Sequence, residues 1–198
     1  MYYFKEGVMN KSLFLVFLLS LLGGCALTPQ KVLVNPDVRV IESEAGKGKT
    51  VALKVTDARP DKILGYRTTR LDKDSIILTD SDIAKVVQEK LYEGLKKKDF
   101  NVDVLSEGAP RSLRVEVKTL QYSAPTGSWT GGIRIIATVN AVVKNGDMTY
   151  ENLYEVENKE RVIIKPSQEK NEELINKTLA DVLQRMLQDQ KLIALLAK

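Results

Sequence analysis

The chain has one cysteine, Cys25, and the tripeptide Leu22-Gly23-Gly24 stands directly before it. A deprotonated thiol is the strong nucleophile among the common side chains, so Cys25 is the first candidate for covalent chemistry. Histidine is absent from all 198 residues. Its absence removes the commonest general base, the Ser-His and Cys-His nucleophile pairs and the commonest metal ligand. We therefore expect chemistry at Cys25 alone, with no catalytic site, no metal and no other cofactor.

The residues before Cys25 have the pattern of a removable export signal. Residues 13–22 form an apolar run of about ten residues, and Lys11 supplies a positive charge in front of it. Such a run is too short for a helix to cross a bilayer core of about 30 Å, but it suits a signal peptide. With Leu22, Gly23 and Gly24 it resembles the bacterial lipobox. We predict a lipoprotein signal peptide over residues 1–24, in which Met9 is an alternative start to Met1.

The lipobox implies that the chain is cut before Cys25 and that the thiol carries a diacylglyceryl group. Two or three acyl chains hold a protein stably on a membrane, whereas a single chain is marginal. Ala26 and Leu27 differ from the acidic start that retains lipoproteins in the inner membrane, so we expect the periplasmic leaflet of the outer membrane. The alternative, a buried structural cysteine ending a core helix, leaves the order of charged, apolar and small residues unexplained.

Charge and cysteine content exclude several classes of protein. The formal net charge is +4, and lysine and glutamate alternate along the chain instead of forming a basic stripe. A nucleic-acid-binding surface needs such a stripe, so we expect no nucleic-acid partner. The run Lys96-Lys97-Lys98 suits the C-terminal turn of a helix. One cysteine cannot form a disulfide or a zinc cluster within the chain.

Residues 25–31 read as the lipidated cysteine and a short tether, and residues 32–198 as one periplasmic domain large enough for its own core. Alternating apolar residues predict strands, and apolar residues three and four apart predict helices. The expected fold is α+β, a mostly antiparallel sheet with two helices packed on one face. The Asn145-Gly146 pair predicts a hairpin. The expected strands cover residues 32–41 (an edge strand broken at Pro36), 50–56, 75–78, 102–104, 113–121, 133–143 and 148–157, the helices 79–98 and 171–188, and a last apolar turn 192–196.

These features together resemble the YajG-type outer-membrane lipoproteins over nearly the whole chain. The resemblance rests on the lipobox, the strand end Val55-Thr56-Asp57-Ala58-Arg59-Pro60, the amphipathic helix, the long hairpin and the closing Met186-Leu187-Gln188-Asp189. It implies a lipid anchor. The molecular role of that family is not established.

Three groups of residues are candidates for partner binding, each with a structural alternative. Asp57 and Arg59 would bind a carboxylate or a partner, or else close a turn before Pro60. Trp129 lies in a segment rich in glycine, serine and threonine and would anchor an interface, or else fold over the sheet edge. Tyr150 and Tyr154 fit packing on one face of the sheet better than a sugar platform.

The sequence therefore favours a non-catalytic interaction module, bound to the membrane through acyl chains on Cys25, with an envelope protein or the cell wall as partner. The alternative is a carrier of a lipid or other hydrophobic ligand, and an envelope hydrolase is a third reading. A cavity between the layers favours the carrier, and a filled core favours the module.

Six residues from Cys25 to Lys31 reach at most about 20 Å, or about 80 Å if residues 32–49 are also unpaired.

Overall fold

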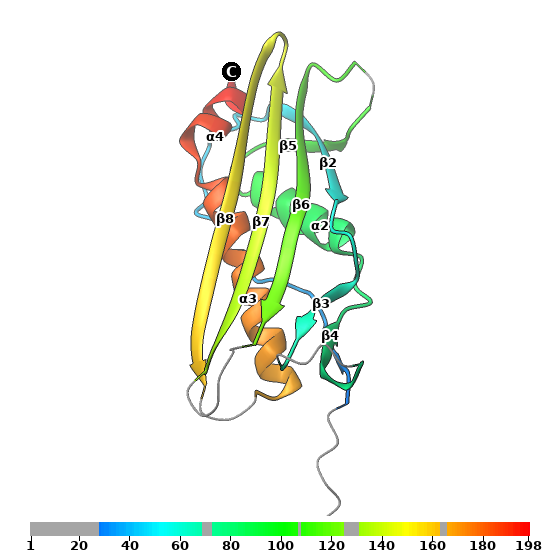
Figure 1. Cartoon of the computed structure of the whole chain (residues 1–198). Coiled ribbons are helices and arrows are strands. Elements are labelled where there is room, and N and C mark those ends of the chain that lie inside the picture. The colour runs from blue at the N-terminus through cyan, green and yellow to red at the C-terminus, as the bar shows by residue number, and fades with distance from the viewer. Residues whose placement is uncertain (1–27, 69–72, 107, 125–130, 163–165) are drawn as a thin grey trace, which may run out of the picture.

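The computed structural model describes residues 28–68, 73–106, 108–124, 131–162 and 166–198. Over these residues the chain forms one mixed sheet, with helices on one of its faces (Figure 1). The strands are β1 (Gln30–Lys31), β2 (Thr50–Asp57), β3 (Ile63–Tyr66), β4 (Ile76–Leu78), β5 (Asn101–Val104), β6 (Arg111–Ser123), β7 (Gly131–Asn145) and β8 (Met148–Val162). The helices are α2 (Ile83–Lys96), α3 (Gln168–Leu187) and α4 (Gln190–Ala197), with a 3₁₀ turn at Lys73–Ser75.

The sheet forks at β6. On one side, β6, β7 and β8 form a long antiparallel ribbon. On the other side, the first half of β6 pairs with β2, which pairs with β5, and the last residues of β6 pair with β3, which leads to β4 and β1. The pairs β1–β4, β2–β5, β2–β6 and β3–β6 are parallel. The α+β class is thus confirmed, whereas the expected mostly antiparallel sheet is a mixed one, because distant segments supply the neighbours of β6.

The β7–β8 hairpin is confirmed, with its turn one residue further along than expected. Asn145 pairs with Met148, so the two-residue loop is Gly146-Asp147. Gly146 has a φ of 57°. A glycine with positive φ at the first loop position is typical of type II′ turns, which suit the twist of the flanking strands.

Three helices cover the sheet among the described residues, not the two that we expected. The extra one is α4, which the sequence indicated only as an apolar turn. Asp189 has an extended backbone, with ψ of 109°, so the helical conformation of α3 does not continue through it. Its side chain caps α4 by accepting hydrogen bonds from the N–H groups of Lys191 and Leu192. Leu192 and Leu196 are fully buried. A single capping residue therefore divides the C-terminal segment into two helices.

Helix α2 begins four residues later than predicted. Asp82 caps it by accepting from the N–H of Lys85, whereas Thr79 accepts from Ser81 before the helix starts. Gly94 lies where α2 approaches α3, and an added Cβ there would stand 2.6 Å from Leu187 Cδ1. The glycine thus permits the close approach of the two helices.

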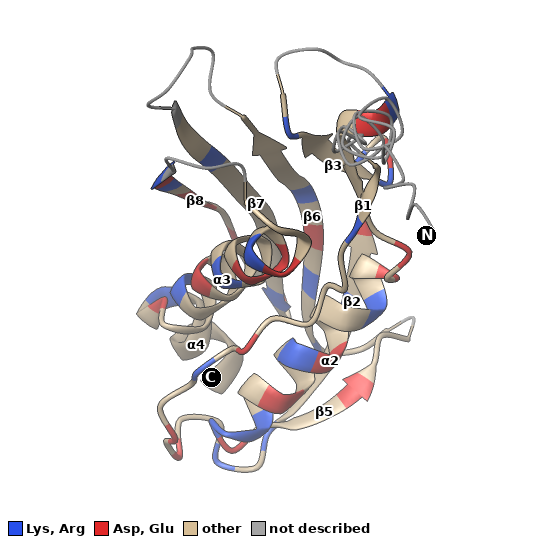
Figure 2. Cartoon of the chain, turned by 90° about the horizontal axis from the view of Figure 1, so that it is seen from below, with Lys and Arg blue, Asp and Glu red and all other residues tan. Residues whose placement is uncertain are grey.

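Residues 32–41, here called the strap, are not the edge strand that we predicted. The strap is extended but runs between α2 and α3, without a ladder partner after the N–H of Val32 (Figure 2). Its backbone is bound by helix side chains: Glu172 accepts from Leu33, and Asn176 Oδ1 accepts from Asn35 at 2.7 Å. Burial alternates along the strap because its two sides face the helices and the solvent, and this alternation has the period of a strand.

Candidate interaction surfaces

Asp57 and Arg59 meet at the end of β2. Arg59 Nε and Nη2 donate to the two carboxylate oxygens of Asp57 at 2.8 and 2.7 Å, and the N–H of Arg59 donates to the same carboxylate. The Arg59 side chain is only 5% exposed. Such a bidentate pair offsets the two charges, although Nη1 of Arg59 is buried without a hydrogen-bond partner among the described residues. This geometry is that of the turn alternative, and a role toward a partner stays a prediction.

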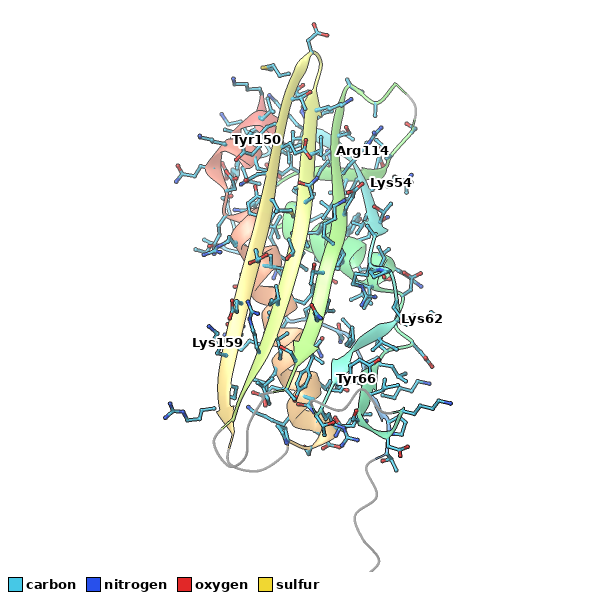
Figure 3. The ribbon with its side chains drawn as sticks, viewed as in Figure 1. Lys54, Lys62, Tyr66, Arg114, Tyr150 and Lys159 are labelled. Carbon is cyan, nitrogen blue, oxygen red and sulfur yellow. The ribbon has the colours of Figure 1, made fainter. Side chains whose placement is uncertain are left out.

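Arg59 also borders a cavity of about 640 Å³ at the fork of the sheet. The cavity arises because β2 leaves β6 after Val117, while β3 joins β6 only at Tyr122. Leu120 and Tyr66 are among its lining residues, and Figure 3 shows Tyr66 in the lower part of the sheet. Burial raises the pKa of Tyr122 to about 12, against an opposing effect of the nearby Arg67. The hydroxyl of Tyr122 therefore stays neutral at physiological pH.

The tyrosines of β8 serve the packing of a helix. Tyr154 and Tyr150 donate to Asp189 Oδ2 at 2.6 and 2.9 Å, and Asn152 donates to it at 3.3 Å. Burial raises the pKa of both tyrosine hydroxyls, and their hydrogen bonds to Asp189 raise it further. The pair thus faces the start of α4 and does not form an exposed aromatic platform.

The remaining candidates, Leu22, Gly23, Gly24, Cys25 and Trp129, lie outside the described residues. Within the described ranges, no helix is long and apolar enough to span a membrane. The same ranges contain no group of three or more acidic, cysteine or histidine side chains placed to hold a metal ion.

A surface that sequence reasoning missed lies between β5 and α2. It is a groove of about 670 Å³, here called the β5 groove. Val104 at its end is 77% exposed, and Tyr92 on α2 is 42% exposed. Lys96 Nζ lies 5.5 Å from the centre of the Tyr92 ring. The groove is lined by Leu53, Asp82, Ala84, Lys85, Gln88, Glu89, Tyr92, Glu93, Val102, Asp103 and Val104.

The β5 groove was missed because β5 and α2 meet only through the fold. Val102 and Val104 alternate with polar residues, which predicted the strand but not its place at the edge of the sheet. The edge position follows from parallel pairing of β5 with β2 alone. No local sequence pattern predicts that Val104 is exposed, because a valine in a strand is ordinarily buried.

Another edge of the sheet, β8, is partly covered. Arg185 of α3 donates to the backbone carbonyl of Glu155 at 2.7 Å, and charged side chains alternate along the strand. Glu157 receives hydrogen bonds from Arg134 and lies beside Lys159, and these hold the pKa of its carboxyl at about 2. Charged, covered edges resist the addition of another strand.

Comparison with known protein families identifies the chain. A family profile described as "Uncharacterized lipoprotein" matches residues 36–197. The chain belongs to this family, the YajG family. The match confirms the family that the sequence resembles, and this YajG-family lipoprotein has no match among curated proteins.

Two solved structures are similar to this YajG-family chain to different degrees. Protein XCC0632 from Xanthomonas campestris, a DUF330 protein, is 11% identical with a TM-score of 0.54, and the match covers 84% of this chain and 95% of that one. Rare lipoprotein B from Shewanella oneidensis is 12% identical with a TM-score of 0.42, covering 72% of this chain and 94% of the other. The likeness to XCC0632 shows a shared fold alone, because the sequence identity is low.

Proposed function

We propose that this lipoprotein is a non-catalytic interaction module, anchored through Cys25 in the periplasmic leaflet of the outer membrane, and that it binds an envelope protein through the β5 groove. Membership of a lipoprotein family supports the anchor, and the neutral residues Ala26 and Leu27 support the outer membrane. No enzymatic step is part of the proposal.

The observation that carries the proposal is the contrast between β5 and β8, two of the three edge strands of the described sheet (the third is the two-residue β1). On β8, Arg185 donates to a backbone carbonyl, and the exposed Leu153 lies between Glu151 and Glu155 on the outer face of the sheet. On β5, by contrast, the last residue is an exposed valine beside an exposed tyrosine of α2. Natural sheets normally blunt their edges, so an open apolar edge favours a binding surface.

The interior supports the module over the carrier. Side chains from both layers fill the space between the helices and the sheet, and many of them, such as Leu179, Leu183 and Val139, are fully buried. The β5 groove and the fork cavity both open at the surface, at the rim of the sheet. A carrier needs a ligand-sized space enclosed by apolar side chains.

The strap limits the length of the tether between Cys25 and the domain. Because the strap packs between α2 and α3, it does not lengthen the tether, and the first paired strand begins at Gln30. Five residues from Cys25 to Gln30 reach at most about 18 Å. The shorter of the two reaches that the sequence allowed therefore applies, which supports a position of the β1 end of the domain close to the membrane surface. β5 lies at the other end of the strand order from β1 (Figure 1), so the groove itself is further from the anchor.

The test is crosslinking in living cells with a photo-reactive residue at position 104 of the full lipidated protein. We expect one protein adduct from position 104 and none from position 147, an exposed site in the β7–β8 turn that serves as the control. Adducts of equal yield at both positions, or no protein adduct at 104, would contradict binding through the β5 groove.

A further inference from the structure

We infer that the β5 groove receives an extended segment of the partner that carries lysine or arginine and adds a strand to the sheet beside β5. This inference rests on the proposed function and names the chemistry of the partner. Three features of the groove carry it: free backbone groups on β5, an apolar floor, and an excess of negative charge at the rim.

The backbone of β5 has free hydrogen-bonding groups along its outer edge. The N–H groups of Asn101 and Leu105 donate to Lys49 and Leu53 of the β2 segment. Alternate residues of a strand direct their N–H and C=O groups to opposite edges, so those of Val102 and Val104 point away from β2. An added strand would therefore make its ladder bonds with these two residues, as in other cases of strand addition.

The side chains beside this edge offer apolar contact to alternate residues of an added strand. Val102 and Val104 lie on the same side of β5, and both line the groove together with Tyr92 of α2. Val102 is partly buried against the core, whereas Val104 is 77% exposed and so lacks cover on the described chain. An extended segment laid along β5 would cover Val104 and the ring of Tyr92.

The rim of the groove is acidic on a chain whose net charge is +4. Four carboxylates line the groove, from Asp82, Glu89, Glu93 and Asp103, against the single ammonium group of Lys85. Glu89, Glu93 and Asp103 take part in no ion pair among the described residues, and Figure 2 shows acidic positions on both α2 and β5. Complementary charge sets partner choice and association rate, so a basic segment is favoured over an acidic one.

The test uses the full lipidated protein in detergent and a fluorescein-labelled octapeptide of alternating valine and lysine. A valine–glutamate octapeptide of the same length tests charge, and a valine–lysine octapeptide with N-methylated valines tests the backbone ladder. We expect at least about tenfold weaker binding for each control peptide, because the first lacks the charge and the second lacks the N–H donors.

Two variants of the protein locate the site. Glu89→Lys should weaken binding of the valine–lysine peptide about tenfold, whereas Asp147→Lys, with the same change of net charge in the exposed hairpin turn, should leave it within about twofold. Amide hydrogen exchange should slow at Val102 and Val104 on binding, an effect that adsorption of a basic peptide by charge alone would not produce.

The outcomes separate this inference from the proposed function. Equal binding of the N-methylated peptide, or equal weakening by Glu89→Lys and Asp147→Lys, overturns the added basic strand. If position 104 still crosslinks to one protein in cells, binding through the β5 groove stands and only the chemistry of the segment is wrong. If neither the peptide binds at the groove nor a cellular protein crosslinks there, the added basic strand and the proposed binding through the β5 groove are both wrong.

Discussion

Asp189 joins three parts of the chain through one carboxylate. Its Oδ1 accepts from the backbone of α4 and its Oδ2 accepts from Tyr150 and Tyr154 of β8. Burial raises the pKa of this carboxyl, but the hydrogen bonds from Tyr154, Tyr150 and the two backbone N–H groups outweigh burial and lower the pKa below its ordinary 3.8. The charged form is therefore the one that the fold stabilises.

Asp189→Ala should lower the free energy of unfolding by about 2–4 kcal/mol. The loss of the cap of α4 costs about 1 kcal/mol, and the hydroxyl of the buried Tyr154 loses its acceptor at about 1–3 kcal/mol more. Urea unfolding of the chain from residue 26 onward measures the change. Asp147→Ala, in the exposed turn, should stay within about 0.5 kcal/mol. Equal effects of the two changes would contradict the role of Asp189.

The same carboxylate predicts a dependence on pH. Since the folded-state pKa of Asp189 lies below the unfolded value, its contribution is complete above about pH 5 and disappears as pH falls through the folded-state pKa. Asp189→Asn keeps a capping oxygen but loses the charge. The stability difference between the wild type and Asp189→Asn should therefore be largest near pH 7 and shrink below pH ~4. A stability difference between the wild type and Asp189→Asn that stays constant with pH would contradict a role of the Asp189 charge.

Single residues differ in how far the sequence predicts them. Asp57 and Arg59 were expected either to bind a carboxylate or a partner or to close a turn, and they pair with each other at the turn that ends β2. The predicted lipobox can be recognised from sequence alone, because the expected signal peptidase would act on an extended segment whose residue order carries the signal. Asp189, in contrast, was named only as the last residue of a segment that resembles the family. Its structural role could not be predicted, because its tyrosine partners lie 35 and 39 positions away on β8.

Among the elements, the strap shows how a period of two can mislead. Its buried side faces two helices instead of a second sheet layer, and Pro36 within it is buried. Alternation reports which side of an extended segment is covered, but not what covers it. The helix side chains that bind the strap, Glu172 and Asn176, are more than 130 positions distant in the chain.

Asn176→Ala should release part of the strap. Asn176 accepts from the N–H of Asn35 and donates to the carbonyl of Leu33 at 2.9 Å, so the variant should lose about 1–2 kcal/mol. Trypsin should also cut at Arg39 faster than in the wild type. Lys177→Ala removes only an exposed ion pair with Asp181 and should change the unfolding free energy by less than about 0.5 kcal/mol. Unchanged cleavage at Arg39 in Asn176→Ala would refute this account of the strap.

β3 was not predicted, and Gly65 shows why. This glycine interrupts the apolar pattern of a four-residue strand and has a φ of 153°. An added Cβ would stand 1.8 Å from the carbonyl oxygen of Tyr122 on β6. The pairing of β3 with β6 therefore requires glycine, which a sequence pattern counts as a break.

Gly65→Ala should lower the free energy of unfolding by about 3 kcal/mol or more, because the methyl group forces β3 away from β6. Gly48→Ala is the matched control, since Gly48 also has positive φ (70°) but no atoms within 4 Å of an added Cβ. It should cost only the backbone strain of about 1–2 kcal/mol. Thermal unfolding of both variants distinguishes clash from strain, and similar melting temperatures would speak against a tight contact at Gly65.

At the scale of the whole molecule, local periodicity predicted the long elements and missed their arrangement. β7, β8 and the two longer helices follow from repeats within 10 to 20 residues, whereas the parallel pairs of β2 join segments about 50 to 60 positions apart. Nothing in a single strand specifies such a neighbour. The fork of the sheet, and with it the β5 groove, could not be predicted for the same reason.

Cys25→Ser should detach the molecule from the outer membrane. Without the thiol, neither the diacylglyceryl group nor the cleavage that follows it is possible, and the precursor should remain soluble or in the inner membrane. Separation of the two membranes by density, followed by immunodetection, measures this. As a control, Ser20→Ala in the apolar run should leave the distribution of the protein between the two membranes unaltered. Recovery of Cys25→Ser in the outer membrane at the wild-type level would disprove the anchor.

The path of the strap has a mechanical consequence. The strap enters beside β1 and runs along α3 from Glu172 past Asn176 toward Leu187, where Val40 packs near Gly94. If Cys25 carries the proposed acyl chains, a tension on them acts nearly along the strap, so that the bonds of Leu33 and Asn35 to α3 are sheared together instead of being peeled off one after another. Bonds loaded in parallel share a force. With a partner in the β5 groove, a pull between the membrane and the partner would load these bonds between the strap and α3 in series with the groove itself.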